Sequence, residues 1–167
     1  MIYGGVHPTS VAWAIGLIKQ GAVDAGRDSD DAKVSVLCGL EVSEDEDTAR
    51  QCVRWAAAAC ANHIADVMKR NPEYGMPEEM TRLVDARTQH YDYYEGHLDS
   101  DADRTAFLTE GLIDDFAIAG RPGKCAEKRR ALEGLGVWQV SSAYYKGRND
   151  QLRRIGSEVI AALDGVS

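Results

Sequence analysis

The sequence lacks the features of a disulfide-stabilised, secreted or membrane-spanning protein. Its four cysteines form no Cys-x-x-Cys pair and no close framework spacing, so we expect reduced, mostly buried thiols at Cys38, Cys52, Cys60 and Cys125. No apolar run approaches the length of a membrane span, and the first residues lack the basic and apolar parts of a secretion signal. We therefore expect a cytoplasmic protein with no membrane partner.

Positive charge is also scarce. The chain has 19 lysines and arginines against 27 aspartates and glutamates, a formal charge of −8 and a pI near 5.0. Nucleic-acid binders need clustered cations that release counterions from phosphates, so DNA and RNA are not expected partners. The 167 residues, with 44% hydrophobic content, are enough for one domain with its own core.

Two motifs resemble ligand sites but lack parts of them. Cys60 and His63 lie three residues apart on one predicted helix, yet no second pair with ligand spacing completes a tetrahedral metal site. Residues 118–125 resemble a P-loop, but Ile118 replaces its first glycine, Cys125 replaces its serine or threonine, and a helix precedes it. We predict no metal and no P-loop nucleotide site.

Helical periodicity covers much of the chain. The spacing of apolar residues predicts helical stretches at 8–26, 43–71, 77–117, 122–134 and 150–163. Thr9 or Ser10 is the expected cap of the first helix, and Ser43 with Glu46 forms a capping box before the second. In the last stretch, the residues expected to face inward are Leu152, Ile155, Val159 and Ile160.

Three stretches predict strands between these helices. Residues 1–6 form a strand remnant, residues 34–42 alternate apolar and polar side chains, and Val137, Trp138 and Val140 suit a buried strand over 137–141. Strands that alternate with helices imply a parallel sheet with right-handed crossovers. Because three strands cannot close a barrel, we expect another part to cover the sheet edge and inner face.

Taken together, these stretches resemble the luciferase-like monooxygenases, (β/α)8-barrel oxidoreductases that use FMN or the deazaflavin coenzyme F420. Matching segments are Ile2-Tyr-Gly-Gly, residues 22–28, the strand 34–42 with its acidic continuation 43–50, residues 116–122, and Glu158-Val-Ile. The segment 116–122 resembles the family's Gly-Thr-Pro-Glu-Glu element. Gly123 and Arg129 depart from the family pattern, which usually has glutamate and an apolar residue there.

The resemblance implies an α/β fold that is the carboxyl-terminal part of a TIM barrel. Residues 1–167 would form one partial domain with about strands six to eight, their helices, and a helical insertion at about 77–117. Because the first five strands would be missing, with much of the cofactor and substrate site, the chain alone should be inactive or nearly so. The implied partners are a small-molecule substrate and either a second copy or a complementing amino-terminal barrel half.

The resemblance also implies that the loops after these strands face the cofactor pocket. The expected cofactor contacts are Gly4, Gly5 and His7, and the expected substrate contacts are Glu41, Ser141, Ser142, Tyr144 and Arg148. An imidazole can donate a hydrogen bond or a proton near neutral pH. Structural roles remain open: a helix-initiating turn for His7, a simple turn for the glycines, capping for the serines and tyrosine, and solvent contact for Arg148.

The sequence is compatible with two functions. In the first, the chain belongs to an oxidoreductase in which FMN or F420 passes hydride to or from a small organic substrate, and the acidic composition with the resemblance favours the deazaflavin. In the second, it is a non-catalytic α/β module that self-associates through its open sheet face or complements another chain.

Overall fold

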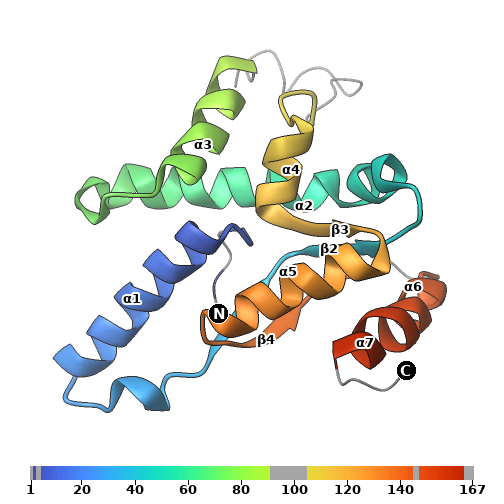
Figure 1. The fold of residues 1–167 in the computed structure, drawn as a ribbon. Helices are drawn as coiled ribbons and strands as arrows, with labels where there is room; N and C mark the ends of the chain where they lie inside the picture. The colour runs from blue at the N-terminus through green and yellow to red at the C-terminus, as the bar shows by residue number, and fades with distance from the viewer. Residues whose placement is uncertain (1, 3–4, 91–104, 145–146, 164–167) are drawn as a thin grey trace.

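The structure is a computed structural model that describes residues 2, 5–90, 105–144 and 147–163. It is mixed α/β and mostly helical (Figure 1). The elements are α1 (Pro8–Asp24), a 3-10 turn (Ser29–Asp31), β1 (Val34–Leu37), β2 (Gly39–Val42), α2 (Glu46–Arg70), a second 3-10 turn (Pro72–Tyr74), α3 (Glu78–His90), α4 (Glu110–Phe116), β3 (Ala117–Gly120), α5 (Pro122–Gly134), β4 (Val137–Ser141), α6 (Asn149–Arg154), a π-helical stretch (Ile155–Ile160) and α7 (Ala161–Leu163).

The predicted helical insertion is only partly described. Helices α3 and α4 lie in it, whereas residues 91–104 are outside the described residues. Among the described helices, none combines the length and apolar character that a membrane crossing requires.

The predicted strands pair in parallel. β1 pairs with β4, and Ile2 forms a parallel bridge with Val36. The Ile2 N–H donates to the Ser35 carbonyl at 2.7 Å, and the Leu37 N–H donates to the Ile2 carbonyl at 2.9 Å. Parallel pairing is what helical crossovers between successive strands require.

The predicted strand 34–42 divides at Cys38 and changes its partner there. β1 pairs with β4, whereas β2 pairs in parallel with β3, with Gly39 opposite Ala117. The Cys38 N–H donates to the Ser141 carbonyl at 3.1 Å and joins the two ladders. No strand was predicted over 117–120. This omission is corrected by β3, whose four residues are all buried.

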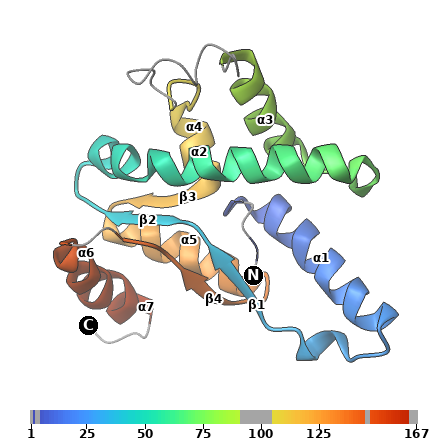
Figure 2. The same ribbon diagram turned by 180° about the vertical axis from the view of Figure 1, so that it is seen from behind.

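Helices cover the two ladders unequally. α5 lies against one face of the strands (Figure 1), and α2 crosses β2 and β3. Gly39 permits that crossing, because a Cβ there would lie 2.9 Å from Val53 Cβ. Figure 2 shows β1 and β4 from behind with no helix in front of them. This uncovered sheet face carries half-buried Ser35 and Leu37 and exposed Gln139.

The expected burial of Trp138 is wrong. Its exposed fraction is 61%, and Lys33 Nζ lies 5.2 Å from the centre of its ring. The pairing shifts between Val34 and Ser35, which face Val137 and Gln139, so Trp138 has no residue opposite it. A bulged residue leaves the regular alternation of the strand, and here the indole turns toward solvent.

Two apolar clusters form the core. One packs α2, α3 and α4 around Leu83, Ile113 and Phe116. The other packs α1 and α5 against the strands around Val36 and Leu132. All four cysteines are free, and burial raises the pKa of the Cys38 thiol to about 12.

The predicted helix caps need correction. Asp45, and not Ser43 with Glu46, caps α2, and its carboxylate accepts N–H groups of the first turn. The Ser43 hydroxyl instead accepts the Asp45 N–H at 3.1 Å, because Ser43 lies two residues before the N-cap position. In α1, His7 is the N-cap residue in place of Thr9 or Ser10, and it makes no side-chain cap bond.

The expected inward face of the last helical stretch is also partly wrong. Leu152 and Ile160 are exposed, whereas Val159 and Gln151 are buried. The Gln151 amide faces the end of β2, where its Oε1 accepts the Val42 N–H at 3.1 Å and its Nε2 donates to the Val42 carbonyl at 3.2 Å. The π-helical turns that follow further change the rotation of side chains about the axis.

Replacing Gln151 with alanine is expected to lower the free energy of unfolding by about 1.5 kcal/mol, because the buried Val42 N–H would lose its partner. The Val42 carbonyl keeps a bond from Arg154 at 3.0 Å. Urea denaturation followed by circular dichroism measures the change. Gln51→Ala is the matched control, an exposed helical glutamine whose loss should cost less than about 0.5 kcal/mol. Equal losses for the two variants would refute the role of Gln151.

Candidate functional site

Two groups of polar side chains lie after the strands. The first, the His7 cluster, consists of His7, Ser10, Glu79 and Asp115, and His7 follows the short parallel bridge at Ile2. The second, the Glu41 cluster, consists of Glu41, Tyr144 and Arg148, at the end of β2 and after β4. The carboxyl ends of parallel strands are where α/β folds bind ligands.

The His7 cluster joins three helices. His7 Nδ1 lies 3.0 Å from Oε1 of Glu79 on α3, and the Ser10 hydroxyl of α1 donates to the same oxygen at 2.8 Å. The backbone N–H groups of Val6 and His7 both donate to the carbonyl of Asp115 on α4, at 2.9 and 3.0 Å. These bonds fix both the backbone and the ring of His7.

The two carboxyl groups of the His7 cluster differ in their electrostatics. Burial favours a raised pKa for Glu79, but its own N–H, the Ser10 hydroxyl and His7 outweigh that effect and lower the pKa. Burial raises the pKa of Asp115, and the nearby His7 and Arg82 only partly oppose it. Glu79 is therefore the ionised partner of His7.

Gly5 has a packing role in the structure. Its φ is +97°, and a Cβ there would lie 2.6 Å from Cδ1 of Phe116 and 2.9 Å from the carbonyl oxygen of Asp115. The phenyl ring fills the space that a side chain would need. A cofactor contact at Gly5 stays a prediction, and Gly4 lies outside the described residues.

The Glu41 cluster brings together three of the predicted substrate contacts. Arg148 forms an ion pair with buried Glu41, and the Tyr144 hydroxyl donates to the Leu40 carbonyl at 2.5 Å. Burial raises the pKa of Glu41 in spite of Arg148, and burial raises the pKa of Tyr144 to about 12. The open alternative of solvent contact for Arg148 is therefore incomplete, because its guanidinium is paired.

The other two predicted substrate contacts lie between β4 and this cluster. Ser141 ends β4, and its carbonyl accepts the Cys38 N–H. The Ser142 hydroxyl oxygen is buried, and within the described part of the chain no group meets the geometric criteria for a hydrogen bond to it, although hydrogen bonding between Ser142 and Tyr144 opposes the rise in the tyrosine pKa. A buried hydroxyl without a partner is uncommon in a folded protein, and a ligand group would satisfy it.

The hollows of the described surface differ in what they can hold. The one beside the Glu41 cluster has about 20 Å³, room for about one water molecule. A cavity of about 480 Å³ is lined by Arg82, Thr109, Gly111, Leu112 and Asp115, next to the His7 cluster. An apolar groove of about 270 Å³ runs between α1, α2 and α3 and includes Trp13, Leu17, Val67 and Met76.

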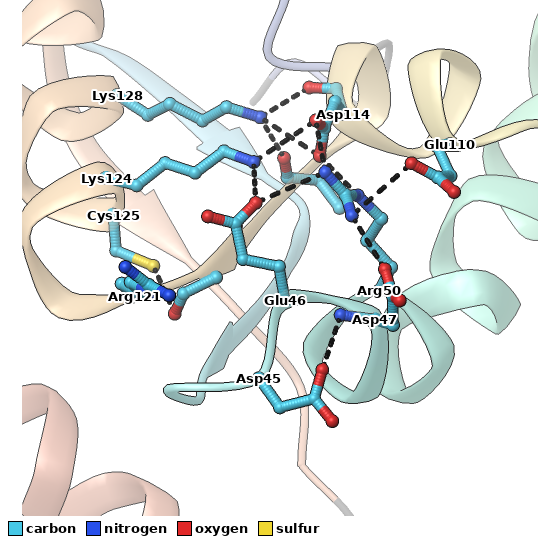
Figure 3. A network of polar contacts seen from close by, with 12 residues as sticks. Asp45, Glu46, Asp47, Arg50, Glu110, Asp114, Arg121, Lys124, Cys125 and Lys128 are labelled. Atoms are coloured by element: carbon cyan, nitrogen blue, oxygen red, sulfur yellow. Dashed lines mark hydrogen bonds and ion pairs between the residues drawn. The ribbon is translucent and has the colours of Figure 1, made fainter.

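A third group of charged side chains connects α2, α4 and α5 (Figure 3). Asp114 accepts hydrogen bonds from Arg50 at 3.3 Å and from Lys124 at 3.2 Å, and Lys124 also bonds Glu46 at 2.9 Å. Lys128 donates to the carbonyls of Asp114 and Ala117 at 2.6 and 3.0 Å. Because these cations have carboxylate or carbonyl partners, the group joins α2, α4 and α5 structurally.

The sequence is similar to those of known proteins. The sequence model of the family described as "Luciferase-like monooxygenase" matches residues 1–139. The chain belongs to this family. The 5,10-methylenetetrahydromethanopterin reductase of Methanopyrus kandleri is 24% identical over 156 residues, which are 92% of this chain and 42% of that protein.

A solved structure has a similar fold over part of its length. The coenzyme F420 dependent tetrahydromethanopterin reductase from Methanopyrus kandleri matches with a TM-score of 0.59 and 22% identity, over 96% of this chain and 44% of that chain. This likeness shows that the fold matches part of a TIM-barrel-family structure. The luciferase-like chain thus spans less than half the length of these two relatives.

Sequence reasoning missed two members of the His7 cluster in this luciferase-like chain. Glu79 was treated only as part of a helical stretch, and Asp115 was not singled out. The sequence does indicate that Glu79 is buried. It lies between Glu78 and Met80, at the edge of the apolar face of the predicted helix. No signal in the sequence pairs it with His7, 72 positions away.

Proposed function

We propose that this chain supplies about strands six to eight of a luciferase-like barrel and works in an oxidoreductase that uses FMN or F420. The observation that carries the proposal is the parallel order of Ile2, β1 and β4, with an uncovered sheet face. A barrel interior needs the remaining strands to fill it. The F420 dependence printed for the Methanopyrus kandleri structure supports the choice of a deazaflavin.

The polar groups after the strands fit the ring of such a cofactor better than its phosphate. The Ser142 hydroxyl and the His7 ring can donate hydrogen bonds to heteroatoms of a ligand or accept hydrogen bonds from them. Arg148 is held by Glu41, which leaves less of its charge for a phosphate. We assign the phosphate contacts to the rest of the barrel. A bound flavin or deazaflavin supplies hydride transfer, while the protein orients the reacting groups.

Cofactor titration tests this proposal. The purified chain is mixed with F420 or FMN, binding is followed by cofactor fluorescence, and turnover is followed by cofactor absorbance. We expect no measurable turnover and weak binding, because most of the pocket would belong to the missing strands. Stoichiometric binding with turnover by the chain alone would refute its incompleteness.

The alternative is a non-catalytic module that self-associates through the uncovered sheet face. Exposed Trp138, the bulged neighbour of Gln139 on β4, favours it, because large exposed aromatic side chains are typical of interfaces. A stable dimer by size exclusion without affinity for either cofactor would support this alternative over the oxidoreductase. Trp138→Lys should then dissociate the dimer, whereas Leu152→Lys, which changes an exposed residue of α6, should not.

A further inference from the structure

Glu79 stands out among the carboxylates of the described residues because it is 5% exposed and its acid group contacts a histidine. It lies in the first turn of α3, where the helix dipole favours a negative charge. An ionised carboxylate only accepts hydrogen bonds. The contact of 3.0 Å therefore places the imidazole proton on Nδ1 of His7.

That assignment determines the chemistry of the other ring nitrogen. In a neutral imidazole with Nδ1 protonated, Nε2 carries the free electron pair and accepts a proton. The side chain of His7 is 33% exposed, and no other described residue makes a hydrogen bond to its ring. Nε2 is thus the nitrogen that a bound molecule can reach.

The surroundings keep the ring in this orientation. Ser10 holds the same carboxylate oxygen as His7, so Glu79 stays in place when the imidazole moves. The backbone of His7 is held by the Asp115 carbonyl, and Pro8 begins α1 directly after it. The cavity of about 480 Å³ shares Asp115 with this group and is also lined by Arg82, whereas His7 is not one of its lining residues.

We propose that Glu79 is a positioning residue that holds His7 in the Nδ1–H form, so that Nε2 exchanges a proton with a small molecule that binds at the exposed side of the ring. The proton leaves an O–H or N–H of that molecule and forms the Nε2–H bond. The resulting imidazolium is neutralised by the Glu79 carboxylate, and the reverse transfer restores the neutral ring. This role in a reaction rests on the proposed function, whereas the ring form does not.

Imidazole 15N NMR of the full chain tests the positioning. Spectra are recorded at a pH where histidine is neutral, and the His7 signals are assigned by their loss in His7→Gln. We expect the Nδ1–H form to dominate in the wild type. Dominance of the Nε2–H form would overturn the proposal without any further variant.

Glu79→Ala tests the cause. We expect it to shift His7 toward the Nε2–H form and to slow acylation of Nε2 by diethyl pyrocarbonate severalfold, as measured by peptide mass spectrometry. Glu78→Ala, at the adjacent exposed position of α3, should change neither the ring form nor the acylation rate. An unchanged ring form in a folded Glu79→Ala would refute the positioning.

The proposal for His7 and Glu79 and the oxidoreductase proposal can be refuted independently of each other. Addition of F420 or FMN to the wild type should move the Nε2 resonance if the ligand site is used. Binding of a cofactor without any change at Nε2 would overturn proton exchange at His7 and leave the oxidoreductase standing. A stable dimer with no affinity for either cofactor, found together with the expected ring form, would overturn the oxidoreductase and leave the positioning by Glu79 standing.

Discussion

Replacing Gly5 with alanine is expected to lower the free energy of unfolding by about 3 kcal/mol, from backbone strain and overpacking together. The φ of +97° is one that alanine rarely adopts, and the new Cβ would lie 2.6 Å from Cδ1 of Phe116. Phe116 is fully buried, and the carbonyl of Asp115 closes the other side, so neither neighbour can move cheaply. Denaturant unfolding monitored by circular dichroism measures the change.

Gly26→Ala is the matched control for this prediction. Gly26 has a φ of +69° but no atom within 4 Å of an added Cβ. Only the backbone strain of an alanine at positive φ would therefore destabilise that variant. We expect that variant to lose about 1 kcal/mol. If the two variants lost equal stability, the contact with Phe116 would carry no weight, and Gly5 would again be open to a cofactor role.

Replacing Arg148 with alanine is expected to destabilise the folded chain by about 2 kcal/mol at pH 7, less than the loss of a fully buried pair because the arginine is 35% exposed. The variant leaves the buried Glu41 carboxylate without its ion-pair partner. Thermal unfolding at several pH values measures the effect. Arg153→Ala removes an exposed arginine of α6 and should change stability little.

The direction of the pH dependence follows from the pKa of Glu41. Burial raises this pKa in the folded chain above the value of an unfolded glutamate, about 4.3, and removal of Arg148 should raise it further. Below the pKa of the unfolded chain, the Glu41 carboxyl is protonated in both the folded and the unfolded chain. Arg148→Ala should therefore lower the free energy of unfolding least in that pH range. The loss should grow as the pH rises through the folded pKa. A loss independent of pH between 4 and 7 would contradict the ion pair as its cause.

The sequence predicted the elements with strong periodicity and missed those set by tertiary contacts. The long helix α2 ends where its apolar stripe meets Asn71 and Pro72, so its length could be read from the sequence. β3 could not, because its four small or apolar residues show no alternation and become a strand through their pairing with β2. Trp138 has high strand propensity, but propensity does not distinguish a buried position from a bulge.

In the candidate site, too, some residues could be predicted from the sequence and others only from the folded structure. The family resemblance pointed to His7, Glu41, Tyr144 and Arg148 as residues at or after strand ends, and the structure brings the last three of them into one cluster. Glu79 comes from a helix far along the chain, and only the folded arrangement joins it to His7. Local patterns define the ends of elements, whereas pairings between distant helices depend on packing that a single sequence does not display.

The change of partner at Cys38 makes the stretch from Val34 to Val42 intolerant of a one-residue change in length. Side chains along it alternate between faces, so inserting or deleting one residue before Val36 would rotate everything beyond it by half a turn. Val36 and Val42 would leave the apolar core, and Glu41 would turn away from Arg148. β1 and β2 are consecutive in the chain and pair with different strands. A shift of register in one ladder would therefore also shift the register of the other.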